Sequence, residues 1–153
     1  MPETLDRPPA VAGEHAAWLP RHRRSAGVAR LLLRRFLEGL DGAEQHLAIG
    51  ELLVSELVAN AVEHAVEQPR VSAGRLIGVR YEVASGVLRI EVHDAGSGRP
   101  EVSEVPAEAE SGRGLWLVRE LAAEWGCSPR TGGVGKCVWA LIGPTRTPGE
   151  EVA

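Results

Sequence analysis

A carboxylate and an amide stand four residues apart in the segment ELLVSELVANAVEHA, as Glu56 and Asn60, and His64 follows after four more. In a helix of about 3.6 residues per turn, this spacing places the three side chains near one stripe. An amide oxygen can bind a hard cation, and a neighbouring carboxylate can orient water or accept a proton. A polar helix edge with a hydrogen-bonded asparagine explains the same residues, and the segment alone does not decide between the two.

A second group follows an alternating segment and contains Asp94, Gly96 and Gly98. An aspartate at the end of a strand can accept a hydrogen bond from an exocyclic amine such as that of adenine. The two glycines allow a tight turn and a close approach to a flat ligand, because no Cβ stands in the way. An ordinary Asp-x-Gly turn is the alternative, so the motif is weak by itself.

The third group, Gly112, Arg113 and Gly114, stands directly before an apolar segment with helical spacing. Glycines at a helix start expose backbone N–H groups, and the helix dipole there favours phosphate. Arg113 adds a positive charge, although a flexible loop before a helix has the same composition. The three groups together offer ligands for a cation, a base and phosphates. They indicate a nucleotide pocket, and residues 95–112 are placed to act as its lid.

Segments with regular hydrophobic spacing must position these residues. Apolar residues at intervals of three and four predict three helices, over about residues 22–40, 43–66 and 115–125. Alternating or short apolar segments predict four strands, at about 77–83, 88–92, 127–130 and 136–142. The first two strands should form an antiparallel hairpin that turns at Ser85 and Gly86. This order predicts an α+β fold, a two-layer α/β sandwich with one mixed or antiparallel sheet and helices on one face.

The composition limits the classes of function. The 153 residues fit one domain, expected at 21–143, with a flexible lead-in at 1–20 and a flexible tail at 144–153. A formal net charge of -4 gives no general reason to expect direct contact with nucleic acid. No apolar run approaches the roughly 20 residues that span a bilayer, and the N-terminal residues do not resemble a signal peptide. We therefore expect a cytoplasmic protein without membrane association.

The cysteines, histidines and tryptophans suggest no further site. Cys127 and Cys137 match no metal-binding spacing, and we expect both to be small buried hydrophobes. The histidines include no pair at ligand spacing, so no zinc site is expected. His93 alternates away from the apolar face of its segment and is not expected to be catalytic. Three tryptophans in apolar segments are expected to pack in the core, namely Trp116, Trp125 and Trp139.

Four stretches resemble the GHKL superfamily of ATPases, which includes DNA gyrase, a heat-shock chaperone, histidine kinases and mismatch-repair proteins. These stretches are SELVANAVEHA, VHDAGSGRP, GRGLWLVRELAAEWG and GGVGKCVWALI. The resemblance covers about residues 20–143. Within the superfamily, the compact chain resembles bacterial anti-sigma-factor serine/threonine kinases and actinobacterial stand-alone ATP-binding regulators.

This resemblance implies ATP and Mg²⁺ as cofactors and a role for each group. Asn60 would be the Mg²⁺ ligand, Glu56 the general base, and Asp94 the acceptor for the adenine amine. Gly96 and Gly98 would shape the base pocket, and Gly112 and Gly114 would line the phosphate lid, where Arg113 could add a direct charge. Two features depart from the family pattern. Lys136 and Cys137 stand where several relatives have a threonine, and the lid segment is rich in glutamate.

The function implied is that of a serine/threonine kinase that phosphorylates an anti-anti-sigma protein and sequesters a sigma factor. Relatives of this type often dimerise, so a homodimer is a further expectation. The alternative is a non-catalytic module of the same fold, either ATP-responsive or nucleotide-independent, that binds a protein partner. A detached sensor-kinase domain ranks last, because the chain before Glu51 has one convincing helix and lacks evident dimerisation helices.

Overall fold

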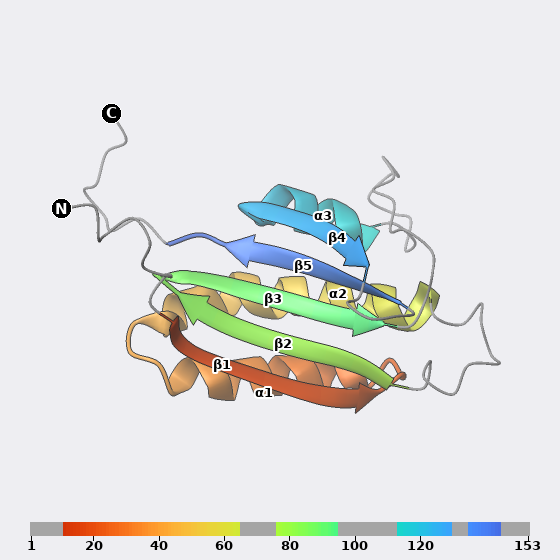
Figure 1. Cartoon of the computed structure of the whole chain (residues 1–153), viewed down its shortest axis with the longest axis horizontal. Coiled ribbons are helices and arrows are strands. Elements are labelled where there is room, and N and C mark those ends of the chain that lie inside the picture. Colours follow the sequence, from red (N-terminus) through yellow and green to blue (C-terminus); the bar gives the residue numbers. More distant parts are fainter. Residues whose placement is uncertain (1–10, 65–75, 95–112, 130–134, 145–153) are drawn as a thin grey trace.

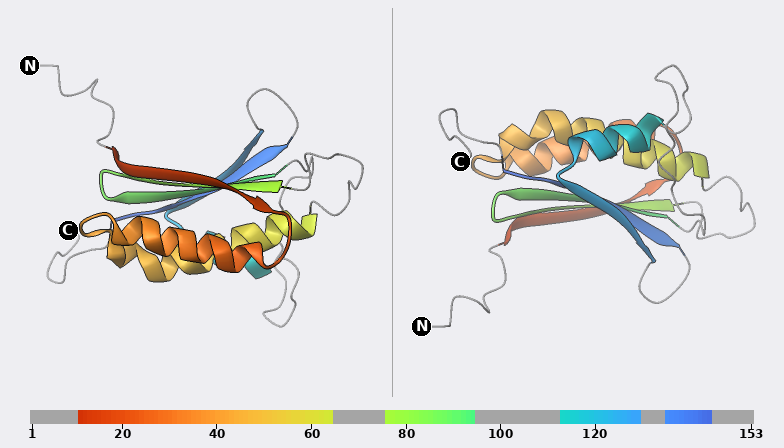
Figure 2. Two further views of the ribbon diagram at one scale, coloured as in Figure 1. Left: turned by 90° about the horizontal axis from the view of Figure 1, so that it is seen from below. Right: turned by 90° about the horizontal axis from the view of Figure 1, so that it is seen from above.

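The structure, a computed structural model of the whole chain, describes residues 11–64, 76–94, 113–129 and 135–144. Its elements are β1 (Val11–Pro20), α1 (Ser25–Glu38), the 3-10 helix η2 (Ala43–His46), α2 (Leu47–His64), β2 (Leu76–Ala84), β3 (Val87–Asp94), α3 (Arg113–Leu121), β4 (Glu124–Pro129) and β5 (Lys136–Ile142). The strands form one antiparallel sheet in the order β1-β2-β3-β5-β4. The helices lie together on one side of this sheet (Figures 1 and 2). The predicted α+β sandwich is confirmed.

The β2–β3 hairpin forms where alternation predicts it. Its turn residues, Ser85 and Gly86, have φ angles of 51° and 78°. Positive φ at both central positions is the geometry whose twist matches that of two paired strands. Every second residue of β3 is buried, ending at Asp94. The two faces of the hairpin are therefore chemically different.

The core lies between the sheet and the helices. The sheet contributes the buried residues of β2, β3 and β5, and α1 and α2 contribute leucines such as Leu33 and Leu57. Tyr81 is fully buried, and its hydroxyl donates a hydrogen bond to the carbonyl oxygen of Ala29 at 2.8 Å. That bond joins β2 to α1 and satisfies the polar end of a large side chain within the core.

Strand β1 corrects an expectation. Residues 11–20, predicted to belong to a flexible lead-in, pair along their length with β2, and Leu19 is buried. Small residues such as Gly13 and Ala17 face the helices here, so hydrophobic alternation is weak in the sequence. A Cβ at Gly13 would lie 3.0 Å from the side chain of Leu40, so a larger residue at this place would require Leu40 to shift. Backbone pairing with one neighbour suffices for an edge strand.

Several element boundaries also differ from prediction. The segment predicted as helix 43–66 begins as the short helix η2 and continues as α2. Helix α3 ends at Leu121, and Trp125, predicted within that helix, belongs to β4 and packs against the core from the sheet. The predicted lid at 95–112 lies outside the described residues, as do residues 1–10 and 145–153. In the described part of the chain, no helix is long and apolar enough to cross a bilayer.

Candidate functional site

Helix α2 runs along β3 from a fixed starting point. Nε2 of the buried His46 lies 2.9 Å from the carbonyl oxygen of Gly86, in the β2–β3 turn. From this contact, Asn60 lies about 21 Å further along the helix at about 1.5 Å per residue. Asp94 lies about 26 Å further along the strand at about 3.3 Å per residue. Asn60 is thus nearly level with the end of β3, and Figure 1 shows the end of α2 beside the end of that strand.

The two flanks of α2 meet different helices. On one flank, Glu51 accepts a hydrogen bond from Arg34 of α1 at 2.8 Å, and Ser55 accepts one from Arg30 at 2.9 Å. Because each helical residue turns by about 100°, Glu56 and Asn60 lie on the opposite flank. Helix α3 packs against α2, and the helices lie side by side in the order α1, α2, α3 (Figure 1). Glu56 and Asn60, both half-buried, therefore lie on the α3 side.

Asp94 ends β3 with its side chain toward the helices. It is 3% exposed, in phase with the buried residues of its strand. Its Oδ2 atom is buried and accepts no hydrogen bond from the described residues. Lys136, the first residue of β5, lies directly opposite Asp94 in the ladder and is 5% exposed. A carboxylate and an ammonium group thus share this end of the core.

The start of α3 reaches the same end of the sheet. Residues 122–123 reverse the chain between α3 and β4, and the last residue of β4, Pro129, lies opposite Lys136. The first turn of α3, with Arg113 and Gly114, is therefore at the end where Asp94 lies (Figure 1). The side chain of Arg113 and the predicted site residues Gly96, Gly98 and Gly112 are outside the described part.

The arrangement gathers three kinds of polar group within one end of the fold. Glu56 and Asn60 offer a carboxylate and an amide oxygen, which suit a hard cation and a proton acceptor. Asp94 offers a buried carboxylate for a hydrogen-bond donor. The first turn of α3 offers backbone N–H groups, to which phosphates bind. These donors fit a nucleotide with its cation, and the roles of the individual residues stay predictions.

A family model described as a histidine kinase-like ATPase domain matches residues 19–142. The chain belongs to this family. The resemblance to the GHKL superfamily is thereby confirmed, and membership implies that this domain binds a nucleotide. The match covers every described element from the end of β1 to the end of β5.

Two solved structures resemble this ATPase domain. The RsbU and RsbW domains of Rv1364c from Mycobacterium tuberculosis match with 22% identity and a TM-score of 0.62, over 88% of this chain and 33% of that one. The histidine kinase domain of the blue-light activated histidine kinase EL346 from Erythrobacter litoralis matches with 28% identity and a TM-score of 0.46, over 81% of this chain and 61% of that one. This chain thus spans about a third of the Mycobacterium tuberculosis chain, whose likeness shows the fold. No curated protein gives a match.

The buried position of Lys136 differs from what the sequence predicts. Lys136 was noted as a departure from the family pattern, yet it is buried opposite Asp94. The signal in the sequence was its place at the start of an apolar strand. That signal could not show which strand would lie beside it, because the pairing of β3 with β5 joins distant segments.

Two expectations about the core are wrong. Cys127 is exposed, because β4 is an edge strand with a neighbour on one side. Trp139 is half-buried on the sheet face without helices, where the guanidinium of Arg89 lies 4.7 Å from the centre of its ring. Cys137 is buried, as expected. The side chain of Trp116 lies outside the described part.

Proposed function

We propose that this ATPase domain is an ATP-binding regulatory protein, a serine/threonine kinase of the anti-sigma-factor type. It would phosphorylate an anti-anti-sigma protein and sequester a sigma factor. The observation that carries the proposal is the position of Glu56 and Asn60 on the α3 side of α2, at the sheet end that also holds Asp94. The four motif stretches of the chain, which resemble those of the anti-sigma-factor kinases, support the kinase type. The fold shared with a solved chain containing an RsbW domain is compatible with it.

The binding roles follow from the chemistry of each group. The amide oxygen of Asn60 would hold Mg²⁺, whose charge neutralises the phosphates of ATP during transfer. Asp94 would accept a hydrogen bond from the adenine amine, and its burial would keep water from competing for that amine. The backbone at the start of α3, with Arg113 and Gly114, would bind phosphate oxygens.

The transfer step needs a proton acceptor beside the phosphates. Glu56 would accept the proton of the serine hydroxyl while the serine oxygen forms its bond to the γ-phosphorus. The bond from the γ-phosphorus to its bridging oxygen would break, and that oxygen would leave with ADP. Glu56 lies one helical turn from Asn60, so base and cation ligand share one flank. Catalysis would rest on positioning and charge neutralisation.

Calorimetric titration with ATP and Mg²⁺ tests the binding part. Wild type and Glu38→Gln, a change at the exposed end of α1, should bind with equal affinity. Asn60→Ala should lose detectable binding, since it removes the proposed cation ligand. Absence of binding to wild type would contradict the proposal and favour the nucleotide-independent module.

Transfer of labelled γ-phosphate to anti-anti-sigma proteins from the same genome tests the catalytic part. Glu56→Gln should bind ATP like wild type and transfer no phosphate, whereas Glu38→Gln should transfer it normally. Equal transfer by Glu56→Gln and wild type would exclude Glu56 as the base. Circular dichroism of each variant shows whether it is folded.

A further inference from the structure

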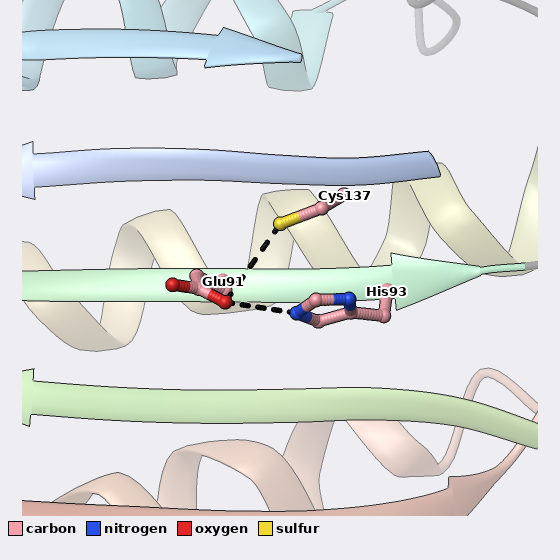
Figure 3. A group of neighbouring side chains, drawn as sticks. All are labelled: Glu91, His93 and Cys137. Atoms are coloured by element: carbon pink, nitrogen blue, oxygen red, sulfur yellow. Dashed lines mark hydrogen bonds and ion pairs between the residues drawn. The ribbon is translucent and has the colours of Figure 1, made fainter. Parts of the chain in front are cut away.

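The sheet has a second face that no described helix covers (Figure 2). On this open face, near the ends of β3 and β5, lie Glu91, His93 and Cys137. Figure 3 shows the imidazole and the thiol both directed at the carboxylate of Glu91. Nε2 of His93 lies 2.9 Å from Oε1 of Glu91, and Sγ of Cys137 lies 3.9 Å from the same oxygen.

The strand register brings the three residues together. Glu91 and His93 are two positions apart on β3 and therefore face the same side. Cys137 lies directly opposite His93 on β5. One ligand atom from each residue lies within 4.8 Å of the other two. The cluster thus depends on the pairing of two strands that are distant in the sequence.

We propose that Glu91, His93 and Cys137 bind Zn²⁺ as a three-residue site. Carboxylate oxygen, imidazole nitrogen and thiolate sulfur are the ligands that proteins offer to this ion. Zn²⁺ bonds of about 2.0–2.3 Å in a tetrahedral arrangement place ligand atoms about 3.3–3.6 Å apart. The separations from Oε1 of Glu91 are 2.9 and 3.9 Å, on either side of this range, and all three ligand atoms lie within 4.8 Å of one another. Side-chain rotations that bring the imidazole and the thiol closer together would close the site.

Glu91 belongs to a network of ion pairs on the open face. Arg80 and Arg89 both donate to Oε2 of Glu91, which leaves Oε1 toward His93 and Cys137. Hydrogen bonding by His93 and then Arg89 lowers the pKa of Glu91 to about 2, so the carboxylate is ionised at neutral pH. Arg80 also pairs with two further glutamates, Glu14 and Glu82. Three carboxylates thus surround two guanidinium groups, and the network keeps a negative charge.

Burial raises the pKa of Cys137 to about 12, so the thiol holds its proton in the free protein. Binding would form a sulfur–zinc bond and release that proton to solvent. The charge of the ion offsets the cost of the thiolate, because the ion lies closer to the sulfur than any other charge. Thiolate formation is thus coupled to the arrival of the metal.

The site has access for an ion and room for a fourth ligand. The side chains of Glu91 and His93 are 13% and 27% exposed. A cavity of about 260 Å³ meets the cluster at His93, and its lining also includes Arg80, Trp18 and Gly78. A water molecule entering through this cavity would complete a four-coordinate site.

The cluster is distinct from the proposed Mg²⁺ ligand. Asn60 lies in the helix layer, whereas the cluster lies on the far side of the sheet. Mg²⁺ prefers oxygen ligands, and a site with nitrogen and sulfur selects a softer ion. Zinc binding is therefore expected in the absence of ATP.

Titration with Co²⁺, a spectroscopic substitute for Zn²⁺, tests the proposal on the purified protein. Wild type should develop a thiolate-to-cobalt charge-transfer band that added Zn²⁺ removes. Cys137→Ser should lose the band. Cys127→Ser, which changes the exposed cysteine, should keep it. Absence of the band in wild type, or its persistence in Cys137→Ser, would overturn the proposal.

A second variant covers the case in which Cys137→Ser does not fold. His93→Gln alters a partly exposed side chain and should weaken Zn²⁺ binding at least about tenfold, because the loss of an outer-shell partner alone has an effect of that size. Competition with a chromophoric chelator measures the Zn²⁺ affinity. Unchanged Zn²⁺ affinity in folded His93→Gln would also overturn the proposal. Equal binding by wild type and Cys127→Ser is the required control.

Discussion

The last residues of β3 and the first residues of β5 lie side by side, and they carry different chemistry on the two faces of the sheet. Toward the helices they present Asp94 and Lys136, both buried. Toward the open face they present His93 and Cys137, which meet Glu91 in a partly buried cluster. A step of one residue along a strand reverses the face, so neighbouring residues face different surroundings. The end of β3 and the start of β5 thus place buried charged residues on one face and potential metal ligands on the other.

The two faces are also held together differently. The helix face is an apolar core with isolated polar contacts such as that of Tyr81. The open face has a network in which Arg80 pairs with three glutamates, and Arg89 joins Glu91 to Trp139. Burial of apolar surface is therefore the main source of stabilisation on the helix face. On the open face, the main contacts are ion pairs that solvent screens.

The largest expected effect comes from substituting two neighbouring residues, Asp94 and His93. Asp94→Asn should weaken ATP binding about tenfold to a hundredfold, since a hydrogen bond to a charged group contributes about 1.5–3 kcal/mol. It should leave Zn²⁺ affinity unchanged. His93→Gln should do the reverse. Calorimetry with each ligand on both variants measures the separation. A variant that lost affinity for both ligands would show that the faces are not independent.

Two glycines, Gly78 and Gly126, lie under tryptophans on the open face. A Cβ at Gly126 would lie 2.6 Å from Cζ2 of Trp139, and one at Gly78 would lie 2.9 Å from Cζ3 of Trp18. Trp18 is 59% exposed and can move outward, whereas Trp139 lies against Arg89. Gly126→Ala should reduce the free energy of unfolding by about 1–3 kcal/mol, and Gly78→Ala by less. Urea denaturation measures both. Equal losses would show that Trp139 moves as freely as Trp18.

The smallest expected changes in the free energy of unfolding come from Tyr81 and its neighbour Arg80. These two substitutions should differ in how they depend on salt. Tyr81→Phe removes a buried hydrogen bond and should reduce the free energy of unfolding by about 0.5–1.5 kcal/mol at any salt concentration. Arg80→Met should cost under about 1 kcal/mol at low salt, and high salt should diminish the loss. Urea denaturation at two salt concentrations distinguishes them. Salt dependence in Tyr81→Phe would contradict the contrast between the faces.

The same tyrosine sets an expectation for alkaline pH. Burial raises the pKa of Tyr81 in the folded state, so the folded state favours the neutral phenol. The stability that this provides is complete below the unfolded pKa of about 10 and is lost as the pH rises through that value toward the folded pKa. Tyr81→Phe should therefore lose less stability than wild type in this range.

Sequence periodicity was a good guide where each element depends on its own residues. The hairpin of β2 and β3 was predicted from strict alternation, and its turn from Ser85 and Gly86. It was a poor guide where an element depends on a neighbour. Strand β1 has little alternation because its inward residues are small, and Trp125 joins β4 because the sheet extends there.

The candidate site likewise has features that the local sequence predicts and features that depend on tertiary contacts. The common stripe of Glu56 and Asn60 follows from helical spacing, and the burial of Asp94 follows from its phase on β3. That these residues reach one end of the fold depends on the contact of His46 with the β2–β3 turn and on the packing of α3 against α2. No local pattern contains either contact.

By itself, the sequence determined the family, the types of element and the groups available for chemistry, because these follow from residue identity and local periodicity. The tertiary structure alone decided which groups meet. Glu91 and Cys137 are 46 residues apart and match no metal-binding spacing, yet antiparallel pairing of β3 and β5 brings their side chains together. The pairing register follows from the packing of the whole core. A local pattern therefore cannot specify the cluster that the register creates.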